Sequence, residues 1–374
     1  MLPKLFNSLV LYSISILTQS ILIAGDNNNN DKDTDVEGKD PNNHKNNART
    51  SEGQRPFYNI GHMCNSISKT KDFLNRGANA IEIDVSFHDD DIYLHHGSPC
   101  DCFRYCNDRV SLIDYLRFAR KVTDPKEMSY WQAFVLLYFD LKLKNFDDDE
   151  KYYQGRRLAN YLKQYFFVKF PVPNTLRMIV AISYADDESF IEGFVNRLKE
   201  LEIFDQVKSF IGFDVGIEKD LQRAKRIWST LNLTNVWQGE GITNCLNPLA
   251  GNNLRNLVSI RDGSDPYFSK VYRWTVDLSD SLRSVLDLHI DGVMTNVPER
   301  VNRIIHSEPD FAMWYRLAEF DDDPFERFRW PATGPARNPL HKTTNTRKIR
   351  NAIKDFGESF RLFIREIYKS TFFG

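Results

Sequence analysis

The feature that most constrains the fold is a regular alternation of strand-like and helix-like segments between residues 57 and 306. Eight short apolar segments have the length and composition of buried strands: Phe57–Met63, Ala80–Phe87, Phe134–Leu143, Arg177–Ser183, Ser209–Asp214, Asn235–Gly239, Lys270–Val276 and Asp291–Thr295. Between most of them lie segments with apolar residues at helical spacing, such as Asp186–Leu201 and Ser279–Leu288. Eight strands with intervening helices over about 250 residues are what a parallel (β/α)₈ barrel requires, so we predict a single-domain α/β TIM barrel.

A doubly wound open sheet is the alternative fold. It is disfavoured because no glycine-rich phosphate-binding loop follows the first predicted strand. Polar side chains gather where the predicted strands end: His62, Glu82, Asp84, Asp140, Lys142, Asp214, Trp274, Asp277 and Asn296. In a TIM barrel these carboxyl ends form the catalytic face, so the barrel predicts one shared site.

The N-terminal residues have the pattern of a secretory signal. Residues 1–25 contain Lys4, then an apolar run from Leu9 to Ala24, and small residues at Ala24-Gly25 that suit cleavage. A retained signal anchor is the alternative. Residues 26–54 are rich in Asn, Asp and Lys, and we expect a disordered leader or propeptide there. We therefore expect a secreted, extracellular protein.

The barrel is predicted to span residues 55–328, with residues 318–328 as a tail packed on it. Residues 329–374 form a basic extension, with ten Lys and Arg against three Asp and Glu. Its apolar residues lie at near-helical spacing, which suits contact with an anionic membrane or partner. A helix packed on the barrel or a frayed end is the alternative. The net charge of −2 gives no reason to expect a nucleic-acid partner, and we expect a monomer.

Five cysteines agree with a secreted protein. Three of them, Cys100, Cys102 and Cys106, crowd into one short segment, while Cys64 and Cys245 lie elsewhere. No histidine or second cysteine pair supplies the spacing of a structural zinc site. Two disulfide bonds and one buried thiol are the simplest arrangement. The glycosylation motif Asn232-Leu-Thr234 adds support for an extracellular protein.

Two predicted strands carry charged residues two positions apart. Glu82 and Asp84 share one face of a strand, and so do Asp140 and Lys142. Burying these charges is costly unless they are compensated, and a divalent cation bound by the three carboxylates would do this. Mg²⁺ prefers such oxygen ligands. Two amphipathic strands with solvated faces are the alternative interpretation.

Two histidines flank the first of these strands. His62 precedes it and His96 follows it, so they can act as base and acid beside the carboxylates. Lys142 can neutralise a phosphate oxygen, and the set suits phosphodiester cleavage. Tyr272 and Trp274 share a strand face near Asp277, and an aromatic face of this kind suits a choline ammonium group.

Seven ordered motifs carry a family resemblance: Asn59–Asn65, Gly77–Phe87, His96–Arg104, Asp140–Leu143, Val236–Leu246, Val271–Asp277 and Met294–Asn296. They resemble the arachnid sphingomyelinase D family, the phospholipase D dermonecrotic toxins of spider venoms, with relatives in ticks and mites. The family belongs to the glycerophosphodiester phosphodiesterase-like barrels. The resemblance covers residues 55 to 328 and includes Asp321–Phe325, which resembles the family's C-terminal tail motif.

The resemblance implies roles for individual residues. His62 and His96 match the catalytic histidines, with His62 as attacker or base and His96 as acid, and Glu82, Asp84 and Asp140 match the Mg²⁺ ligands. Further matches are the substrate-contacting Lys142 and Trp274, with Tyr272, Asp277 and Asn296 as supporting substrate-binding residues. The resemblance also implies the disulfides Cys100–Cys106 and Cys102–Cys245, which leaves Cys64 as a free buried thiol.

The function implied is that of a secreted Mg²⁺-dependent phospholipase D, a phosphodiester-cleaving lyase. It would release choline from sphingomyelin and lysophospholipids at a membrane surface by intramolecular attack, leaving a cyclic phosphate. An internal hydroxyl group has a large proximity advantage over water. Two alternatives stay open: a glycerophosphodiester phosphodiesterase, and a barrel that binds choline lipids without catalysis.

Overall fold

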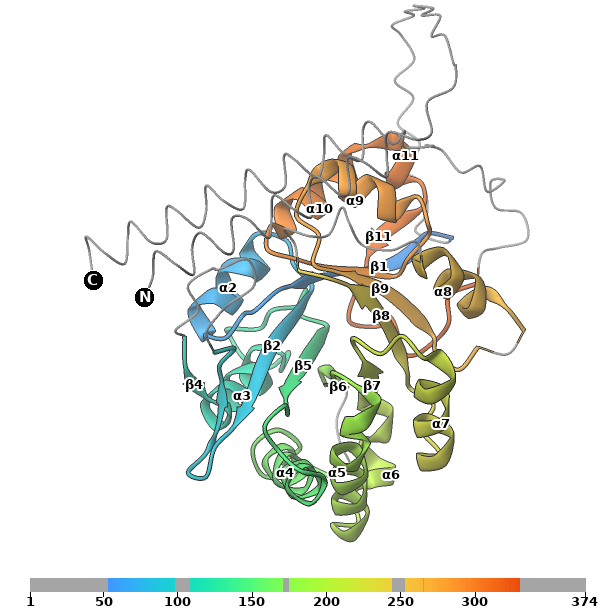
Figure 1. Cartoon of the computed structure of the whole chain (residues 1–374). Helices are drawn as coiled ribbons and strands as arrows, with labels where there is room; N and C mark the ends of the chain where they lie inside the picture. The colour runs from blue at the N-terminus through green and yellow to red at the C-terminus, as the bar shows by residue number, and fades with distance from the viewer. Residues whose placement is uncertain (1–52, 98–107, 171–174, 244–252, 265, 330–374) are drawn as a thin grey trace, which may run out of the picture. The chain divides into compact units, whose positions relative to one another are not determined.

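The computed structural model describes residues 53–97, 108–170, 175–243, 253–264 and 266–329. Within this part of the chain, eight parallel strands surround a common axis (Figure 1): β1 (Arg55–Gly61), β2 (Ala80–Phe87), β5 (Leu136–Lys142), β6 (Arg177–Ile182), β7 (Ile211–Val215), β8 (Trp237–Gly241), β9 (Lys270–Trp274) and β10 (Gly292–Thr295). Their order is β7-β6-β5-β2-β1-β10-β9-β8, with every neighbouring pair parallel. The predicted TIM barrel is confirmed.

The barrel closes between the first and last strands of this order. A parallel bridge joins Phe213 of β7 to Val236, immediately before β8, and the Phe213 amide donates to the Asn235 carbonyl over 2.8 Å. This contact between β7 and β8 is a single bridge, shorter than the other strand pairings, so the barrel is nearly closed.

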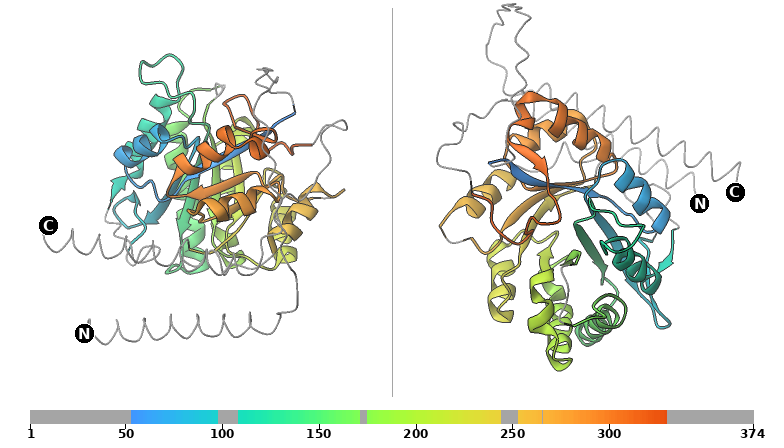
Figure 2. Two further views of the ribbon diagram at one scale, coloured as in Figure 1. Left: turned by 90° about the horizontal axis from the view of Figure 1, so that it is seen from above. Right: turned by 180° about the vertical axis from the view of Figure 1, so that it is seen from behind.

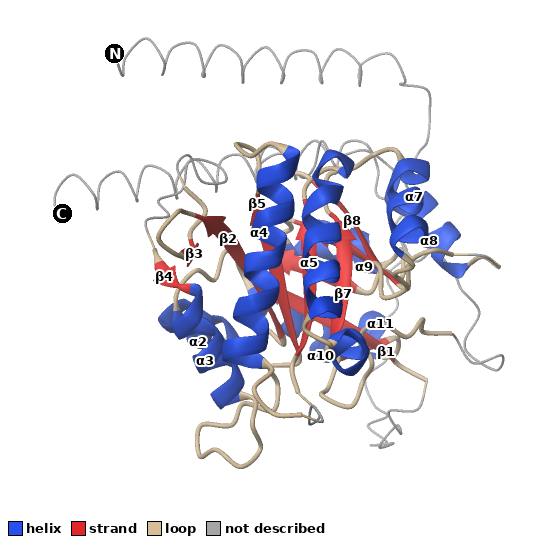
Figure 3. Ribbon diagram, turned by 90° about the horizontal axis from the view of Figure 1, so that it is seen from below, coloured by secondary structure: helices blue, strands red, loops and turns tan. Residues whose placement is uncertain are grey.

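Helices surround the strands, and Figure 3 shows α4 and α5 lying over them. The longer ones are α2 (Ile67–Asn75), α3 (Leu112–Val122), α4 (Asp148–Tyr161), α5 (Glu188–Glu200), α7 (Leu221–Leu231), α8 (Asn253–Asp262), α9 (Ser279–Leu286) and α10 (Pro298–Ser307). Short elements are a π-helical turn at Leu162–Phe166, α6 (Phe204–Val207) and α11 (Pro309–Ala312). Apolar side chains between helices and strands form one core cluster, and a smaller cluster that includes Tyr58, Ile60 and Tyr272 fills the barrel interior.

Three short strands lie outside the barrel order. β3 (Ile92–Leu94) pairs antiparallel with β2, and β4 (Val110–Ser111) pairs with β3. β11 (Tyr315–Leu317) pairs with the start of β1, which brings the end of the described chain beside its beginning (Figure 2).

The residues after β11 pack on the barrel as predicted. The Ala318 amide donates to the Phe57 carbonyl over 2.9 Å, and the Trp237 indole donates to the Pro324 carbonyl over 2.8 Å. Phe325 lies against Gly212, where a β-carbon would come within 2.2 Å of its ring. Glycine is needed there because the aromatic side chain occupies the space of a side chain on β7.

Each predicted strand has its counterpart, with small errors at the ends. The first was predicted to reach Met63 but ends at Gly61, because Met63 has φ 54° and turns the chain away from the sheet. The sixth was predicted as Asn235–Gly239 but runs from Trp237 to Gly241. Strand ends depend on tertiary contacts that periodicity does not contain.

Several predictions fall outside the described residues. They concern the signal peptide, most of the leader, the basic extension and the four cysteines of the two predicted disulfide bonds, Cys100, Cys102, Cys106 and Cys245. Cys64 is described, and it is a free, fully buried thiol, as expected. Across the described ranges we find no helix with the length and apolar character needed to span a bilayer.

Candidate active site

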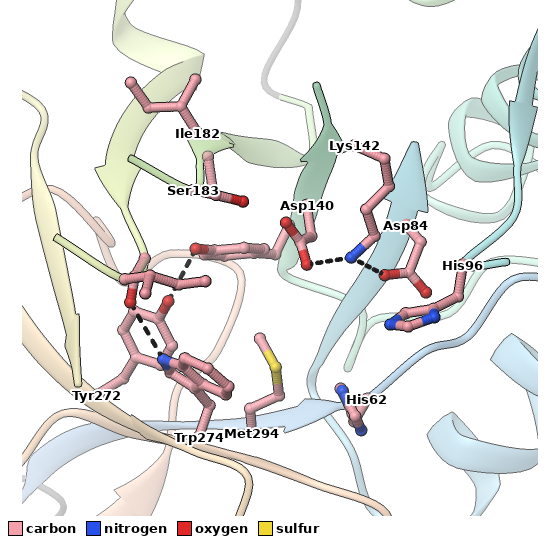
Figure 4. A pocket seen from close by; sticks show the side chains of 14 residues that line it. His62, Asp84, His96, Asp140, Lys142, Ile182, Ser183, Tyr272, Trp274 and Met294 are labelled. Carbon is pink, nitrogen blue, oxygen red and sulfur yellow. Dashed lines mark hydrogen bonds and ion pairs between the residues drawn. The ribbon is translucent and has the colours of Figure 1, made fainter. Parts of the chain in front are cut away.

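A pocket of about 210 Å³ opens at the carboxyl ends of the barrel strands. Its wall is formed by His62, Asp84, His96, Tyr138, Asp140, Lys142, Ala181, Ile182, Ser183, Gly216, Ile217, Tyr272, Trp274 and Met294. Figure 4 shows the histidines, Asp84 and Lys142 on one side and Trp274 and Tyr272 on the other. The barrel therefore brings seven of the ten predicted catalytic, metal-binding and substrate-binding residues to one cavity.

Three carboxylates meet beside this pocket because of strand register. The β2–β5 pairing places Asp84 opposite Asp140, and Glu82 lies two residues earlier on the same face of β2. One oxygen from each of the three lies within 4.8 Å of the others. Glu82 and Asp84 are almost fully buried, so their charges need compensation from within the protein.

Not every oxygen of the three carboxylates has a hydrogen-bond partner within the described chain. Glu82 Oε2 accepts from the Met63 amide over 2.5 Å, while its buried Oε1 has no hydrogen-bond partner within the described chain. Asp84 Oδ2 accepts from the Asn65 side chain over 2.6 Å. An all-oxygen donor set with an unpartnered buried oxygen fits a divalent cation such as Mg²⁺. The three residues are thus a candidate metal centre.

Lys142 lies between two of these carboxylates. Its Nζ is 2.7 Å from Asp84 Oδ1 and 2.7 Å from Asp140 Oδ2 (Figure 4). Because the ammonium is at the pocket wall, it can contact an anionic group that enters the pocket as well as the carboxylates. A role of Lys142 in neutralising a phosphate oxygen stays a prediction.

The electrostatics of the cluster are set by burial and by Lys142. Burial, followed by the charges of Asp84 and Asp140, raises the pKa of Glu82 well above its ordinary value. Burial also disfavours the charged form of Asp84, but Lys142, His96 and the Asn65 hydrogen bond outweigh it and lower its pKa. A divalent cation would favour the deprotonated form of all three carboxylates, so metal binding and proton release are coupled here.

His62 is oriented by residues from two other parts of the chain. Its Nδ1 is 3.2 Å from Asn296 Oδ1, and the Asn296 Nδ2 donates to Asp277 Oδ2 over 3.0 Å. Because Asp277 accepts from the amide nitrogen, Asn296 presents its oxygen to the ring, and His62 Nδ1 must be the donor. In the neutral ring, the lone pair that a general base requires is therefore on His62 Nε2.

Asp277 and Asn296 were expected to bind substrate, yet neither is part of the pocket wall. Asp277 also accepts from the Asn296 backbone amide over 2.8 Å and from the Thr295 hydroxyl over 3.1 Å. The described contacts place this pair behind His62, where it fixes the orientation of the imidazole ring.

His96 follows β3 and lies in the pocket wall near Asp84 (Figure 4). Its Nδ1 is 3.1 Å from the Gly97 carbonyl oxygen. A carbonyl can only accept, so Nδ1 carries a proton and Nε2 is the nitrogen available to exchange a proton with a ligand. Both histidines thus hold Nδ1 in a hydrogen bond with an oxygen acceptor.

The opposite wall is aromatic. Trp274 is the last residue of β9, and its indole donates to the Gly216 carbonyl over 3.3 Å. The hydroxyl groups of Tyr272 and Tyr138 each lie 2.7 Å from Asp214 Oδ2. Burial raises the pKa of Asp214 to about 6, although hydrogen bonds from both tyrosines and the Gly239 amide oppose the shift. The predicted common face of Tyr272 and Trp274 is confirmed, with the Tyr272 hydroxyl engaged by Asp214.

Some wall residues were missed in the sequence. Tyr138 precedes Asp140 by two positions on the same strand, so the face that indicated Asp140 and Lys142 also contained Tyr138. Gly216 is a wall residue that follows β7, and Asn65 contacts Asp84 from outside the wall, after β1. Both lie in irregular segments, where no periodicity signals which residues approach the site. Met294 was predicted as part of a strand and of the motif Met294–Asn296, but no role in the site was assigned to it.

Comparison with known proteins gives consistent results. Residues 52–325 match the sequence model of the family described as dermonecrotic toxin SPH. A dermonecrotic toxin of Loxosceles cf. spinulosa is 37% identical over 72% of this chain and 98% of its own length. Dermonecrotic toxins of Ixodes scapularis and Hemiscorpius lepturus are each 33% identical, over 77% and 74% of this chain and 80% and 86% of theirs.

Among solved structures, a glycerophosphodiester phosphodiesterase from Parabacteroides distasonis is 16% identical, with a TM-score of 0.43, over 68% of this chain and 98% of that one. The family match covers well over half of this chain, and it confirms the resemblance that the seven motifs indicated. The chain therefore belongs to the dermonecrotic toxin SPH family, the phospholipase D enzymes of the sphingomyelinase D type.

Proposed function

We propose that the protein is a secreted, monomeric, Mg²⁺-dependent phospholipase D that releases choline from sphingomyelin and lysophospholipids and leaves a cyclic phosphate. The observation that carries the proposal is the division of the pocket. Acid–base groups, carboxylates and Lys142 line one side, and an aromatic wall containing Trp274 lines the other. A choline phosphodiester has the matching polarity, with an anionic phosphate next to a quaternary ammonium.

The proposed reaction assigns one proton to each histidine. His62 Nε2 takes the proton of the lipid's internal hydroxyl group as its oxygen attacks the phosphorus. The bond between phosphorus and the choline oxygen breaks, and His96 Nε2 donates the proton that the choline oxygen takes up. Lys142 stabilises negative charge on the phosphate oxygens in the transition state. Mg²⁺ held by Glu82, Asp84 and Asp140 would add positive charge at the same phosphate.

The aromatic wall supports recognition of the head group. The face of Trp274 suits contact with a quaternary ammonium, because the negative face of the indole ring attracts a cation that has no hydrogen-bond donors. Asp214 lies in the barrel interior behind Tyr138 and Tyr272 and adds a nearby negative charge when it is ionised. The proposed partners are thus choline phospholipids and the membrane that contains them, with no nucleic acid.

The first prediction concerns the machinery. We expect His62→Ala and Asp84→Ala each to lower choline release from sphingomyelin vesicles by about 10²–10⁴-fold, because each removes a group needed at the reacting phosphate. Circular dichroism should show an unchanged fold. His88→Ala is the matched control, since His88 is exposed and lies outside the pocket wall. Undiminished choline release by both variants would refute the proposal.

The second prediction concerns the metal and the product. EDTA should abolish choline release, and added MgCl₂ should restore it. Phosphorus NMR of the products from lysophosphatidylcholine should show a cyclic phosphate. A linear phosphate monoester would instead identify a hydrolase of the glycerophosphodiester phosphodiesterase type, and tight lipid binding without any product would identify a non-catalytic barrel.

A further inference from the structure

Large apolar side chains are exposed at few positions in the described chain, and two of them flank the mouth of the pocket. The six are Met128, Tyr153, Val168, Phe170, Tyr184 and Ile217. Tyr184 follows β6 and Ile217 follows β7, so both lie at the carboxyl ends of barrel strands. Tyr184 is next to the wall residue Ser183, and Ile217 is itself part of the wall, at its outer edge after Gly216. Tyr184 is 51% exposed and Ile217 is 40% exposed.

The other four lie away from this mouth. Met128 belongs to the connection that leads from α3 into the amino end of β5, and Val168 and Phe170 belong to the connection that leads into β6. Tyr153 lies on α4, outside the pocket wall. Exposed apolar residues beside the pocket are therefore confined to Tyr184 and Ile217 within the described part of the chain.

The two residues stand on a cross-linked backbone. The Ile217 amide donates to the Ser183 carbonyl over 3.0 Å, and the Gly216 amide donates to the Ile182 carbonyl over 2.9 Å. A further contact joins the Ala185 amide to Glu218 Oε2 over 3.3 Å. These bonds continue the β6–β7 pairing beyond the strands, so residues 183–185 and 216–218 form one hydrogen-bonded rim that carries both apolar side chains.

The same rim is connected to the aromatic wall. The Trp274 indole donates to the carbonyl of Gly216, the residue immediately before Ile217. A head group held against Trp274 would thus lie next to the segment that exposes Ile217. The acyl chains of that lipid would remain in the bilayer, at the level of the rim.

The charges on the rim indicate which lipid surface it suits. Asp186, Asp187 and Glu218 lie beside the two apolar residues, and the exposed Lys219 follows Glu218 directly. Arg223 pairs with Asp186, and Lys151 pairs with Asp187 over 3.1 Å, so the nearby cations do not exceed the acidic residues. A rim without excess positive charge has no electrostatic attraction for anionic lipids. Apolar contact is then the main source of membrane affinity.

We propose that Tyr184 and Ile217 form an interfacial anchor that inserts into a zwitterionic choline-lipid surface and positions the pocket over a head group. The inference rests on the proposed function for the identity of the lipid. Contiguous exposed apolar patches mark protein or membrane interaction sites, and Tyr184 and Ile217 lie on neighbouring segments joined by backbone hydrogen bonds. Insertion would remove the apolar surface of the Tyr184 and Ile217 side chains from water, and this burial favours binding to the membrane.

Binding is tested in the full-length His62→Ala background, which prevents turnover. Tyr184→Ser and Ile217→Ser should each weaken sedimentation with phosphatidylcholine vesicles roughly tenfold. Tyr153→Ser and Val168→Ser are the matched controls, with exposed fractions of 59% and 42%, and should bind normally. Equal binding by all four variants would overturn the proposal. So would binding that requires phosphatidylserine and disappears in high salt.

Insertion itself has a spectroscopic readout. A tryptophan placed by Tyr184→Trp should be quenched by vesicles of phosphatidylcholine brominated in the acyl chains, while one placed by Tyr153→Trp should not. Equal quenching at both positions would refute insertion at the rim.

A kinetic comparison separates this proposal from the one on which it rests. Tyr184→Ser in the otherwise native enzyme should lose roughly tenfold in choline release from sphingomyelin vesicles but keep its rate on monomeric lysophosphatidylcholine. Equal loss on both substrates would contradict a role in membrane contact. If the native enzyme releases no choline from either substrate, the proposed function fails, while the sedimentation and quenching results still decide whether the anchor exists.

Discussion

The carboxylate of Asp84 is held by a residue that has no charge and does not line the pocket. Asn65 donates from Nδ2 to Asp84 Oδ2 over 2.6 Å and accepts from the Asp84 backbone amide over 2.8 Å. It is 2% exposed, so water cannot replace these bonds easily. The amide therefore fixes both the side chain and the backbone of a candidate metal ligand, in the way that outer residues commonly orient metal ligands.

We predict that Asn65→Ala weakens Mg²⁺ binding by about 10–100-fold, because Asp84 loses the contact that orients it. Isothermal titration calorimetry with MgCl₂ measures this directly. Ser66→Ala is the control: it removes the N-cap of α2, where Ser66 accepts from the Lys69 amide, and costs about 1 kcal/mol of stability. Unchanged Mg²⁺ affinity in Asn65→Ala, or equal weakening in Ser66→Ala, would contradict the assigned role.

At the scale of elements, α4 and α5 approach each other backbone to backbone. A β-carbon on Gly155 of α4 would lie 2.1 Å from the Phe190 carbonyl oxygen, and one on Gly193 of α5 would lie 2.1 Å from the Tyr152 carbonyl oxygen. These obstacles are main-chain atoms, which cannot rotate away. Glycine in these helices reflects the close crossing, despite its low helix propensity.

Gly155→Ala should therefore destabilise the protein by about 1–3 kcal/mol, even though alanine favours an isolated helix. Urea unfolding followed by circular dichroism gives the free energy of unfolding. Glu192→Ala changes an exposed position of α5 and should stay within about 0.5 kcal/mol of the native value. A Gly155→Ala protein as stable as the native one would show that the helices can separate without cost.

At the scale of the whole molecule, a buried ion cluster joins the two ends of the described chain. Asp291, just before β10, pairs with Arg55 of β1 over 2.5 Å and with Arg261 of α8. The guanidinium of Arg55 lies 4.8 Å from the ring centre of Phe328. Burial disfavours the charged form of Asp291, but Arg261 and Arg55 outweigh it and lower its pKa to about 2.

This pKa predicts a loss of stability in acid. Because the folded-state pKa is below the unfolded value of about 3.9, the contribution is complete above that value and is lost as the pH falls toward 2. The advantage of the native protein over Asp291→Asn should shrink by about 2 kcal/mol between pH 5 and pH 2. Urea unfolding at each pH measures it. Carbon NMR of the native Asp291 carboxyl provides an independent test, and a midpoint near 4 would contradict the prediction.

Much of the barrel was predictable because strands and helices leave different local periodicities. Ala80–Phe87 was predicted with the bounds that β2 has, since a run of apolar residues with Glu82 and Asp84 two apart is a strand pattern. The predicted end of β1 was wrong because the backbone turns at Met63, whose amide donates to Glu82, nineteen residues away. No local pattern contains that contact.

The barrel class, the family and the residue types available for catalysis could be predicted before the fold was known, because alternation and ordered motifs are local properties of the chain. Which of these residues cooperate could be seen only in the folded protein. Closure of the barrel brings Asn296 to His62 across 234 positions, and Arg55 to Asp291 across 236. It also exposes Tyr184 and Ile217 on one rim. Such relations depend on register and closure, which arise only when distant segments pack together.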